Sequence, residues 1–242
     1  MNITKDPELL RRFCRKLVNT SIDAALFTNN GTRRYPEHLD YTLIDCFVQM
    51  LITLLMTLEF NKQVFMNKVL HSIYDKIDHD HKAQRTNFNQ KPYFRMIFLI
   101  LSALNRGVFS NERNQPKAGR SRSGFLNKVF HAIADLFHML NPCAFPGFAF
   151  SWLELVSHQD FMPNLLKRND SQSNEWFKLH VLMTDLFAFL KANLSAEAKQ
   201  PQALRLFYEK TLCLCVRLLN DYPSFLCEYH FNFVNKLPDH CI

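Results

Sequence analysis

Apolar residues recur at steps of three and four along most of this chain, which is the spacing of one face of an α-helix. Leu9, Phe13 and Leu17 show this spacing near the start of the sequence. Residues 37–60 are apolar on most of the surface that a helix would present, so neighbours must cover that helix on several sides. The pattern predicts a protein built of packed helices.

The glycine content supports the same conclusion. Only five glycines occur among 242 residues, whereas 48% of the residues are apolar and 23 are phenylalanine. Few glycines mean few tight turns and hairpins, which favours an all-α fold over an all-β fold. The periodicity predicts roughly ten helices, at residues 6–27, 37–60, 62–77, 91–105, 124–140, 148–158, 160–168, 173–193, 200–220 and 224–234.

Most of the predicted connections are short, and short connections place consecutive helices antiparallel. A row of antiparallel pairs is typical of a HEAT-like stack, a form of α-solenoid. The sequence has no strict internal repeat that would show such a stack by itself. We therefore expect residues 1–242 to form a single helical domain.

The segment from Arg106 to Gly124 departs from this pattern because it is polar and rich in glycine, serine and positive charge. Such a segment cannot bury enough apolar surface to offset the entropy of ordering it, so we expect a flexible basic insertion within the domain. A solvated insertion is the simpler interpretation, and an electrostatic contact is the alternative. The residues that would make this contact are Arg106, Arg113, Lys117, Arg120 and Arg122.

The formal charge of +7 and the isoelectric point of 9.1 are compatible with an acidic partner such as RNA. Charge alone indicates nonspecific association and not a specific site. Direct RNA binding through a basic surface is therefore the alternative function, and a solvated basic surface is the simpler explanation.

Cysteine usage and the N-terminus favour a reducing compartment. The seven cysteines are odd in number, and residues 1–6 contain no apolar signal core. Two apolar runs, at residues 46–58 and 96–105, are shorter than the ~20 residues that a bilayer requires. We expect the cytoplasm, with the nucleus also open. The cysteines expected to act as small buried apolar residues are Cys14, Cys46, Cys213 and Cys215.

No pattern indicates a catalytic residue, a metal ligand set or a cofactor site. Gly-x-Ser-x-Gly and glycine-rich phosphate loops are both missing from the sequence. His79, Asp80 and His81 would diverge on a helix, and no further ligand follows at a zinc spacing. A hydrolase would need a polar pocket of converging titratable groups, which the sequence does not indicate. We therefore expect that the chain is not an enzyme.

Two segments resemble a known family: residues 146–158, which read PGFAFSWLELVSH, and residues 221–230, which read DYPSFLCEYH. Both are similar to the C-terminal superfamily-homology domain of the large NOT scaffold subunit of the CCR–NOT deadenylase complex. The similarity is best from about Phe125 to Ile242, and the chain resembles the N-terminal half of that domain. We interpret the residues that carry it as structural: Pro146, Gly147, Phe148, Trp152, Glu154, His158, Pro223, Phe225, Tyr229 and His230.

The resemblance implies a HEAT-like docking platform without catalytic activity. Its expected partners are the NOT-box subunits of the complex and short motifs of RNA-binding adaptor proteins, with no membrane partner and no cofactor. The implied role is in mRNA deadenylation, mRNA decay and translational repression.

Overall fold

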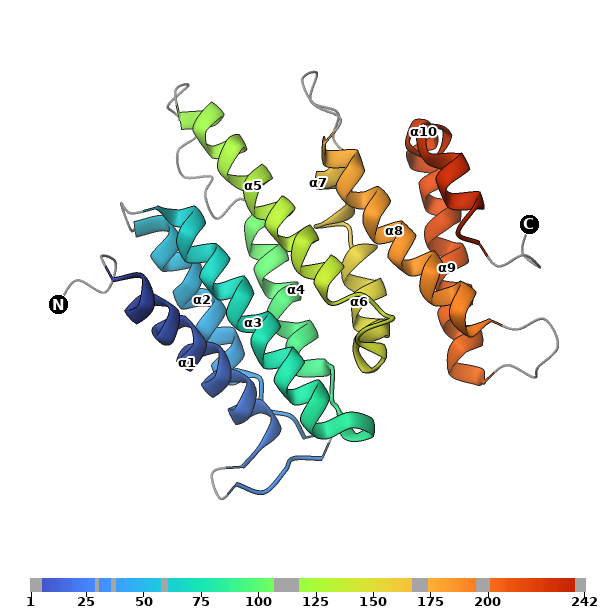
Figure 1. Ribbon diagram of the computed structural model, residues 1–242. Coiled ribbons are helices and arrows are strands. Elements are labelled where there is room, and N and C mark those ends of the chain that lie inside the picture. Colours follow the sequence, from blue (N-terminus) through green and yellow to red (C-terminus); the bar gives the residue numbers. More distant parts are fainter. Residues whose placement is uncertain are drawn as a thin grey trace. The chain divides into compact units, whose positions relative to one another are not determined.

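The computed structural model describes residues 6–28, 31–35, 38–57, 61–106, 118–166, 174–194 and 201–237, except for the side chains of residues 118–123 and 174–175. Over these residues the chain forms ten α-helices and no strand, which confirms the all-α prediction (Figure 1). The chain divides into two compact units, Met1–Leu136 and Phe137–Ile242, with the boundary inside helix α5 (Ala118–Met139). The prediction of a single domain remains a prediction.

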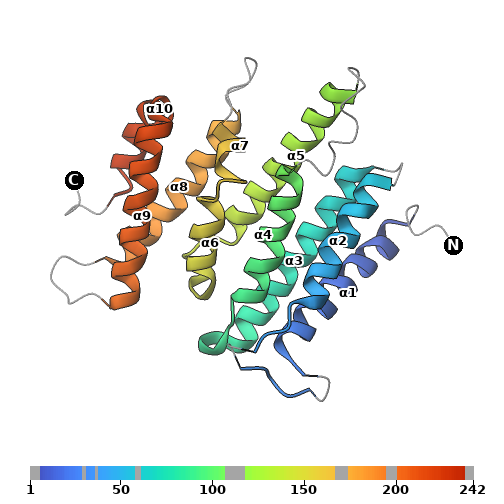
Figure 2. The same ribbon diagram turned by 180° about the vertical axis from the view of Figure 1, so that it is seen from behind.

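The first unit contains two stacked helix pairs, formed by α1 (Pro7–Leu26), α2 (Thr42–Thr57), α3 (Lys62–Gln84) and α4 (Lys91–Asn105). Helix α1 contacts both α2 and α3, and α2 contacts α4. The views from the two sides show α1 and α3 in one layer and α2 and α4 in the other (Figures 1 and 2). Two antiparallel pairs that stack layer on layer are the HEAT-like arrangement predicted from the sequence.

Side-chain N-caps mark the starts of the first and third helices. The Asp6 carboxylate accepts hydrogen bonds from the backbone N–H groups of Glu8 and Leu9 at 2.9 and 3.2 Å. It thereby satisfies two of the amides that a helix start leaves without an internal partner. The Asn61 side chain accepts from the amide of Val64 at 3.3 Å in the same way. These caps stabilise the N-terminal ends of α1 and α3.

The second unit follows the end of α5 with a short 3-10 turn and five helices. The turn is η3 (Pro146–Phe148), and the helices are α6 (Ala149–Val156), α7 (Met162–Leu166), α8 (Asn174–Asn193), α9 (Gln202–Asp221) and α10 (Pro223–Val234). Helix α8 contacts α7 and α10, and α10 also contacts α9. The Phe189 ring of α8 meets the Phe207 ring of α9 edge to face at 5.1 Å, which joins these two helices as well.

Three predicted boundaries are wrong. Helix α2 begins at Thr42, later than the predicted start at residue 37. Helix α3 continues to Gln84, beyond the predicted end at Ile77. Helix α5 begins at Ala118, so residues 118–124 of the predicted flexible loop are helical. The composition of residues 118–124 underestimates their tendency to be helical. The apolar stripe of α5 already specifies a helix, and extending an existing helix needs no new nucleus. Residues 107–117 of the predicted loop lie outside the described residues.

No helix in the described part of the chain is both long enough and apolar enough to cross a membrane.

Candidate functional site

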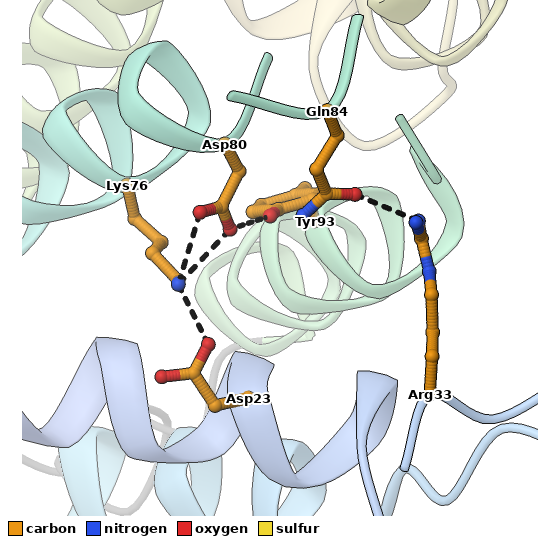
Figure 3. Close-up of polar contacts among 6 residues, drawn as sticks. All are labelled: Asp23, Arg33, Lys76, Asp80, Gln84 and Tyr93. Carbon is orange, nitrogen blue, oxygen red and sulfur yellow. Dashed lines mark hydrogen bonds and ion pairs between the residues drawn. The ribbon is translucent and has the colours of Figure 1, made fainter. Parts of the chain in front are cut away.

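A buried polar cluster joins three helices of the first unit (Figure 3). Lys76 of α3 is 8% exposed, and its Nζ atom lies 2.6 Å from Asp23 Oδ1 of α1. The same nitrogen lies 3.2 and 3.0 Å from the two carboxylate oxygens of Asp80, one turn along α3. Asp80 in turn accepts a hydrogen bond from the hydroxyl of Tyr93 on α4. The cluster therefore links α1, α3 and α4.

The environment of this cluster suppresses ionisation of the tyrosine. Burial is the main cause that raises the pKa of Tyr93, and its hydrogen bond to Asp80 raises the pKa further. The hydroxyl therefore stays protonated and acts as a donor to the carboxylate. Lys76, Asp80 and Tyr93 satisfy one another, which is the arrangement expected of buried polar groups that stabilise a fold.

The neighbouring loop is fixed by a second set of polar contacts. Arg33 Nη2 donates to Gln84 Oε1 at 2.7 Å, as Figure 3 shows, and also to the carbonyl oxygen of Asn87. The loop that follows α1 is thereby held against the C-terminal end of α3.

The histidines next to Asp80 do not form a metal site with it. Asp80 points into the buried cluster, His79 is exposed, and His81 packs edge to face on Phe88 at 5.2 Å. Throughout the described residues, no group of three His, Cys, Asp or Glu side chains is placed to hold a metal ion. Consecutive residues on α3 diverge, as helix geometry requires.

The predicted electrostatic residues are only partly described. Arg106 is exposed at the end of α4. Arg120 and Arg122 belong to α5, but their side chains are not described, and Arg113 and Lys117 lie outside the described residues. The electrostatic contact therefore remains a prediction.

The residues of the first family motif form the interior of the second unit. Phe148 and Trp152 are fully buried, and the Trp152 indole N–H donates to the carbonyl oxygen of Phe137 at 2.7 Å. Pro146 and Gly147 form the 3-10 turn that leads into α6. This motif sets the path of the chain from α5 into α6.

The two ionisable members of this motif lie on the surface side of α6 and just beyond its end. Glu154 is exposed, whereas His158 is half-buried and its Nδ1 atom accepts from the backbone N–H of Asp160 at 3.1 Å. His158 therefore shapes the turn between α6 and α7.

The second motif forms an aromatic cluster between α8 and α10. Pro223 occupies the first turn of α10, where its missing N–H is tolerated. Phe225 is fully buried and meets the Trp176 ring edge to face at 5.9 Å. Tyr229 stacks on His180 with ring centroids 4.4 Å apart. His230 lies outside the cluster, exposed to solvent, with its Nδ1 atom 2.6 Å from the Cys227 carbonyl oxygen.

Burial also shifts the pKa values of two titratable side chains of α8. It lowers the pKa of His180, because the charged imidazolium would lose hydration. It raises the pKa of Asp185, and this effect is opposed by His138, whose Nδ1 atom lies 2.7 Å from the carboxylate. Asp185 and His138 therefore form a hydrogen-bonded pair, whereas His180 packs against the Tyr229 ring.

The prediction that four cysteines are buried is correct for only some of them. Cys14 is buried and Cys215 is half-buried, but Cys46 and Cys213 are exposed. Cys213 lies on the outward side of α9, because the inward side is taken by Phe207 and Leu214. Apolar composition alone does not reveal which face of such a helix is turned inward.

Helix α9 carries an apolar surface that the sequence did not single out. Its inward stripe is Phe207, Thr211, Leu214 and Leu218. On another face, Leu212, Val216 and Leu219 follow one another at i, i+4 and i+7, and they are 46%, 55% and 59% exposed. We call these three residues the α9 outer face. The signal in the sequence was that apolar residues occur on both sides of residues 202–221, as they do in residues 37–60.

Comparison with known proteins identifies the family. The protein family described as "CCR4-Not complex component, Not1" matches residues 111–242. The chain belongs to the Not1 family.

Three curated relatives of Not1 type are similar over most of this chain. The "General negative regulator of transcription subunit 1" of Saccharomyces cerevisiae is 32% identical over 205 residues, or 82% of the chain. The protein of the same description from Schizosaccharomyces pombe is 26% identical over 99% of the chain. The "CCR4-NOT transcription complex subunit let-711" of Caenorhabditis elegans is 25% identical over 85%. The chain spans 8–11% of the length of these relatives.

Two solved structures share this arrangement of helices. A Not1 C-terminal domain in complex with Not4 has a TM-score of 0.77 and 26% identity, and it is matched over 99% of this chain and 46% of its own. The NOT1 superfamily homology domain from Chaetomium thermophilum has a TM-score of 0.79 over 96% of this chain and 43% of its own, with 18% identity. At this identity, the second structure shows similarity of fold alone.

These findings confirm the family resemblance and agree with the prediction that the chain is not an enzyme. The matched Not1 proteins are described as subunits of a complex and as regulators of transcription.

Proposed function

We propose that this chain is a docking module of the CCR4–NOT complex that holds other subunits without catalysing a reaction. In this role it contributes to mRNA deadenylation, mRNA decay and translational repression. Its expected partners are the NOT-box subunits and Not4, with short motifs of RNA-binding adaptor proteins as further ligands. A scaffold for these processes acts in the cytoplasm, so we propose that location, with the nucleus also open.

One observation carries the proposal: the chain is similar over nearly its whole length to a Not1 C-terminal domain that was solved in complex with Not4. The polar groups of the described residues agree with a binding role. The buried cluster of Lys76, Asp80 and Tyr93 is internally satisfied, which suits a rigid support.

The α9 outer face is the surface that we propose for docking. Three large aliphatic side chains about half-exposed on one helix face suit an amphipathic helix or an extended segment of a partner. Full burial of a Val or Leu side chain contributes about 1.5–3 kcal/mol. Covering the exposed half of two such residues therefore contributes about 2 kcal/mol, equivalent to a roughly 30-fold change in Kd.

A binding experiment with purified proteins tests the proposal. The chain is immobilised and presented with Not4 and, separately, with the NOT-box heterodimer, and the retained partner is quantified over a concentration series. The outer-face variant is Val216→Ser/Leu219→Ser. The matched control is Leu43→Ser/Val64→Ser, which removes a similar exposed apolar area from the first unit. Circular dichroism checks that both variants remain helical.

We expect the wild-type chain and the control variant to retain a partner with equal affinity, and the outer-face variant to bind roughly 30-fold more weakly. Retention of neither partner by the wild-type chain would contradict the docking role. Equal binding by both variants would leave the docking role standing and remove the α9 outer face as its site.

A further inference from the structure

A basic pocket lies in the first unit, where the loop after α1 meets the turn between α3 and α4. Arg33, Arg34 and Tyr35 line it from the first loop, and residues 86–91 line it from the turn. Its volume is about 690 Å³, within the range of roughly 300–1,000 Å³ that is usual for ligand pockets. This pocket is separate from the α9 outer face and does not depend on the docking proposal.

The charged residues that line this pocket are all positive. Three lining residues are cations, Arg33, Arg34 and Lys91, and the described lining contains no carboxylate. Arg34 forms a weak ion pair, because its Nη2 atom lies 3.8 Å from an oxygen of Asp40, whose side chain is 49% exposed. The asparagine and glutamine side chains of residues 87–90 add neutral donors. An anionic ligand suits this set of groups.

One of the arginines is held in place before any ligand arrives. Both hydrogen bonds of Arg33, to Gln84 and to the carbonyl of Asn87, use its Nη2 atom. Among the described residues, Nε and Nη1 of this exposed arginine have no hydrogen-bond partner. A guanidinium fixed in this way offers its remaining donors to a phosphate with little further loss of entropy.

The turn that forms one wall of the pocket is conformationally strained. Arg85 has φ 46° and ψ −113°, a conformation that residues with a Cβ rarely adopt. Such strained residues gather at binding sites, where the surrounding contacts hold them.

An exposed aromatic ring beside the pocket indicates which class of anionic ligand fits it. Tyr35 lines the pocket and is 73% exposed, so the packing of the fold does not require its ring. Aromatic rings beside a basic groove stack the bases of single-stranded nucleic acid. A phosphorylated peptide would use the cations but would not need the ring.

We propose that this pocket binds single-stranded RNA, with a backbone phosphate held by Arg33, Arg34 and Lys91 and a neighbouring base stacked on Tyr35. The cations supply affinity that depends on salt, and the tyrosine supplies affinity that does not.

Fluorescence anisotropy with a labelled ten-nucleotide oligouridine, measured at several salt concentrations, tests the proposal. Two variants address the two contributions: Arg34→Gln/Lys91→Gln removes charge and Tyr35→Ala removes the ring. The matched control Arg205→Gln/Lys210→Gln removes the same charge from exposed positions of α9. Thermal unfolding confirms that each variant is folded.

We expect the Arg34/Lys91 variant to bind at least roughly tenfold more weakly at low salt than the control variant. Its slope of log Kd against log salt should fall by about 1.4, because two phosphate contacts contribute ~0.7 each. Tyr35→Ala should weaken binding at least about fivefold at every salt concentration.

Equal losses in the Arg34/Lys91 variant and its control would overturn the site, since only net charge would then matter. Normal RNA binding by Tyr35→Ala, together with displacement of RNA by a phosphoserine peptide of the same length, would overturn the RNA assignment in favour of a phosphopeptide.

Discussion

Substitution of Lys76 by methionine should destabilise the first unit strongly, because it leaves a buried carboxylate without its counter-charge. Asp80 is only 5% exposed, and without Lys76 its described partner is the Tyr93 hydroxyl. Removal of one member of a buried ion pair costs about 3–5 kcal/mol. Asp23 adds little to this loss, because its side chain is 49% exposed and water can replace the lysine.

Removal of the whole cluster should be less harmful than removal of one member. In the variant Lys76→Met/Asp80→Leu/Tyr93→Phe, no buried charge and no buried hydroxyl remain in the cluster. Apolar replacements of similar volume at buried ion pairs are often neutral or stabilising. We therefore expect the triple variant to recover most of the stability that Lys76→Met loses, a non-additivity of about 3 kcal/mol.

Urea unfolding followed by circular dichroism measures both effects. With a slope of about 2 kcal/mol per molar urea, the Lys76→Met midpoint should fall by roughly 1.5–2.5 M. Lys82→Met is the control, because Lys82 is 73% exposed in its pair with Asp78 and its loss should leave the midpoint unchanged.

A Lys76→Met midpoint equal to that of the control would contradict a buried, unpaired Asp80, since this carboxylate would then be hydrated. A triple variant no more stable than Lys76→Met would contradict the charge effect, because packing and not charge would be the source of the loss.

Three further predictions concern the second unit. Trp152→Phe should lower the free energy of unfolding by about 1–3 kcal/mol, since the buried carbonyl of Phe137 loses its indole donor. An unchanged midpoint in urea unfolding would contradict this. Burial lowers the pKa of His180, so the unfolded chain binds a proton first as the pH falls, and stability should drop below about pH 6.5. Melting temperatures at pH 8 and 5.5 should show a smaller drop for His180→Phe, and equal drops would count against this cause. Burial raises the pKa of the Cys215 thiol to about 11, so little reactive thiolate is present at pH 8. An aromatic disulfide reagent should therefore modify Cys215 at least about tenfold more slowly than exposed Cys213. Comparison of the Cys213→Ser and Cys215→Ser variants measures this difference.

The prediction of ten helices succeeded because helix formation leaves a local record. Leu10, Cys14 and Val18 repeat at the helical period, and Asp6 and Pro7 mark where α1 begins. Boundaries such as the start of α5 were less accurate, since a helix that has already nucleated can extend through residues that would not start a helix by themselves.

The positions of the two candidate sites could not be read from the sequence in the same way. Leu212 and Leu214 are alike as residues, yet Leu214 is 3% exposed and Leu212 is 46% exposed. Only the packing of α9 on its neighbours separates them, because hydrophobicity has no direction until a second surface is present.

The linear order of residues determined that this chain is helical, where most helices lie and to which family it belongs. Tertiary structure alone decided that Lys76 meets Asp23, that Tyr93 meets Asp80, and that Arg33 and Lys91 line one pocket. Helical periodicity arises between residues three or four positions apart, so a sequence displays it directly. The pair of Lys76 with Asp23 and the pocket lined by Arg33 and Lys91 join residues more than fifty positions apart, and their geometry exists only after the helices have packed.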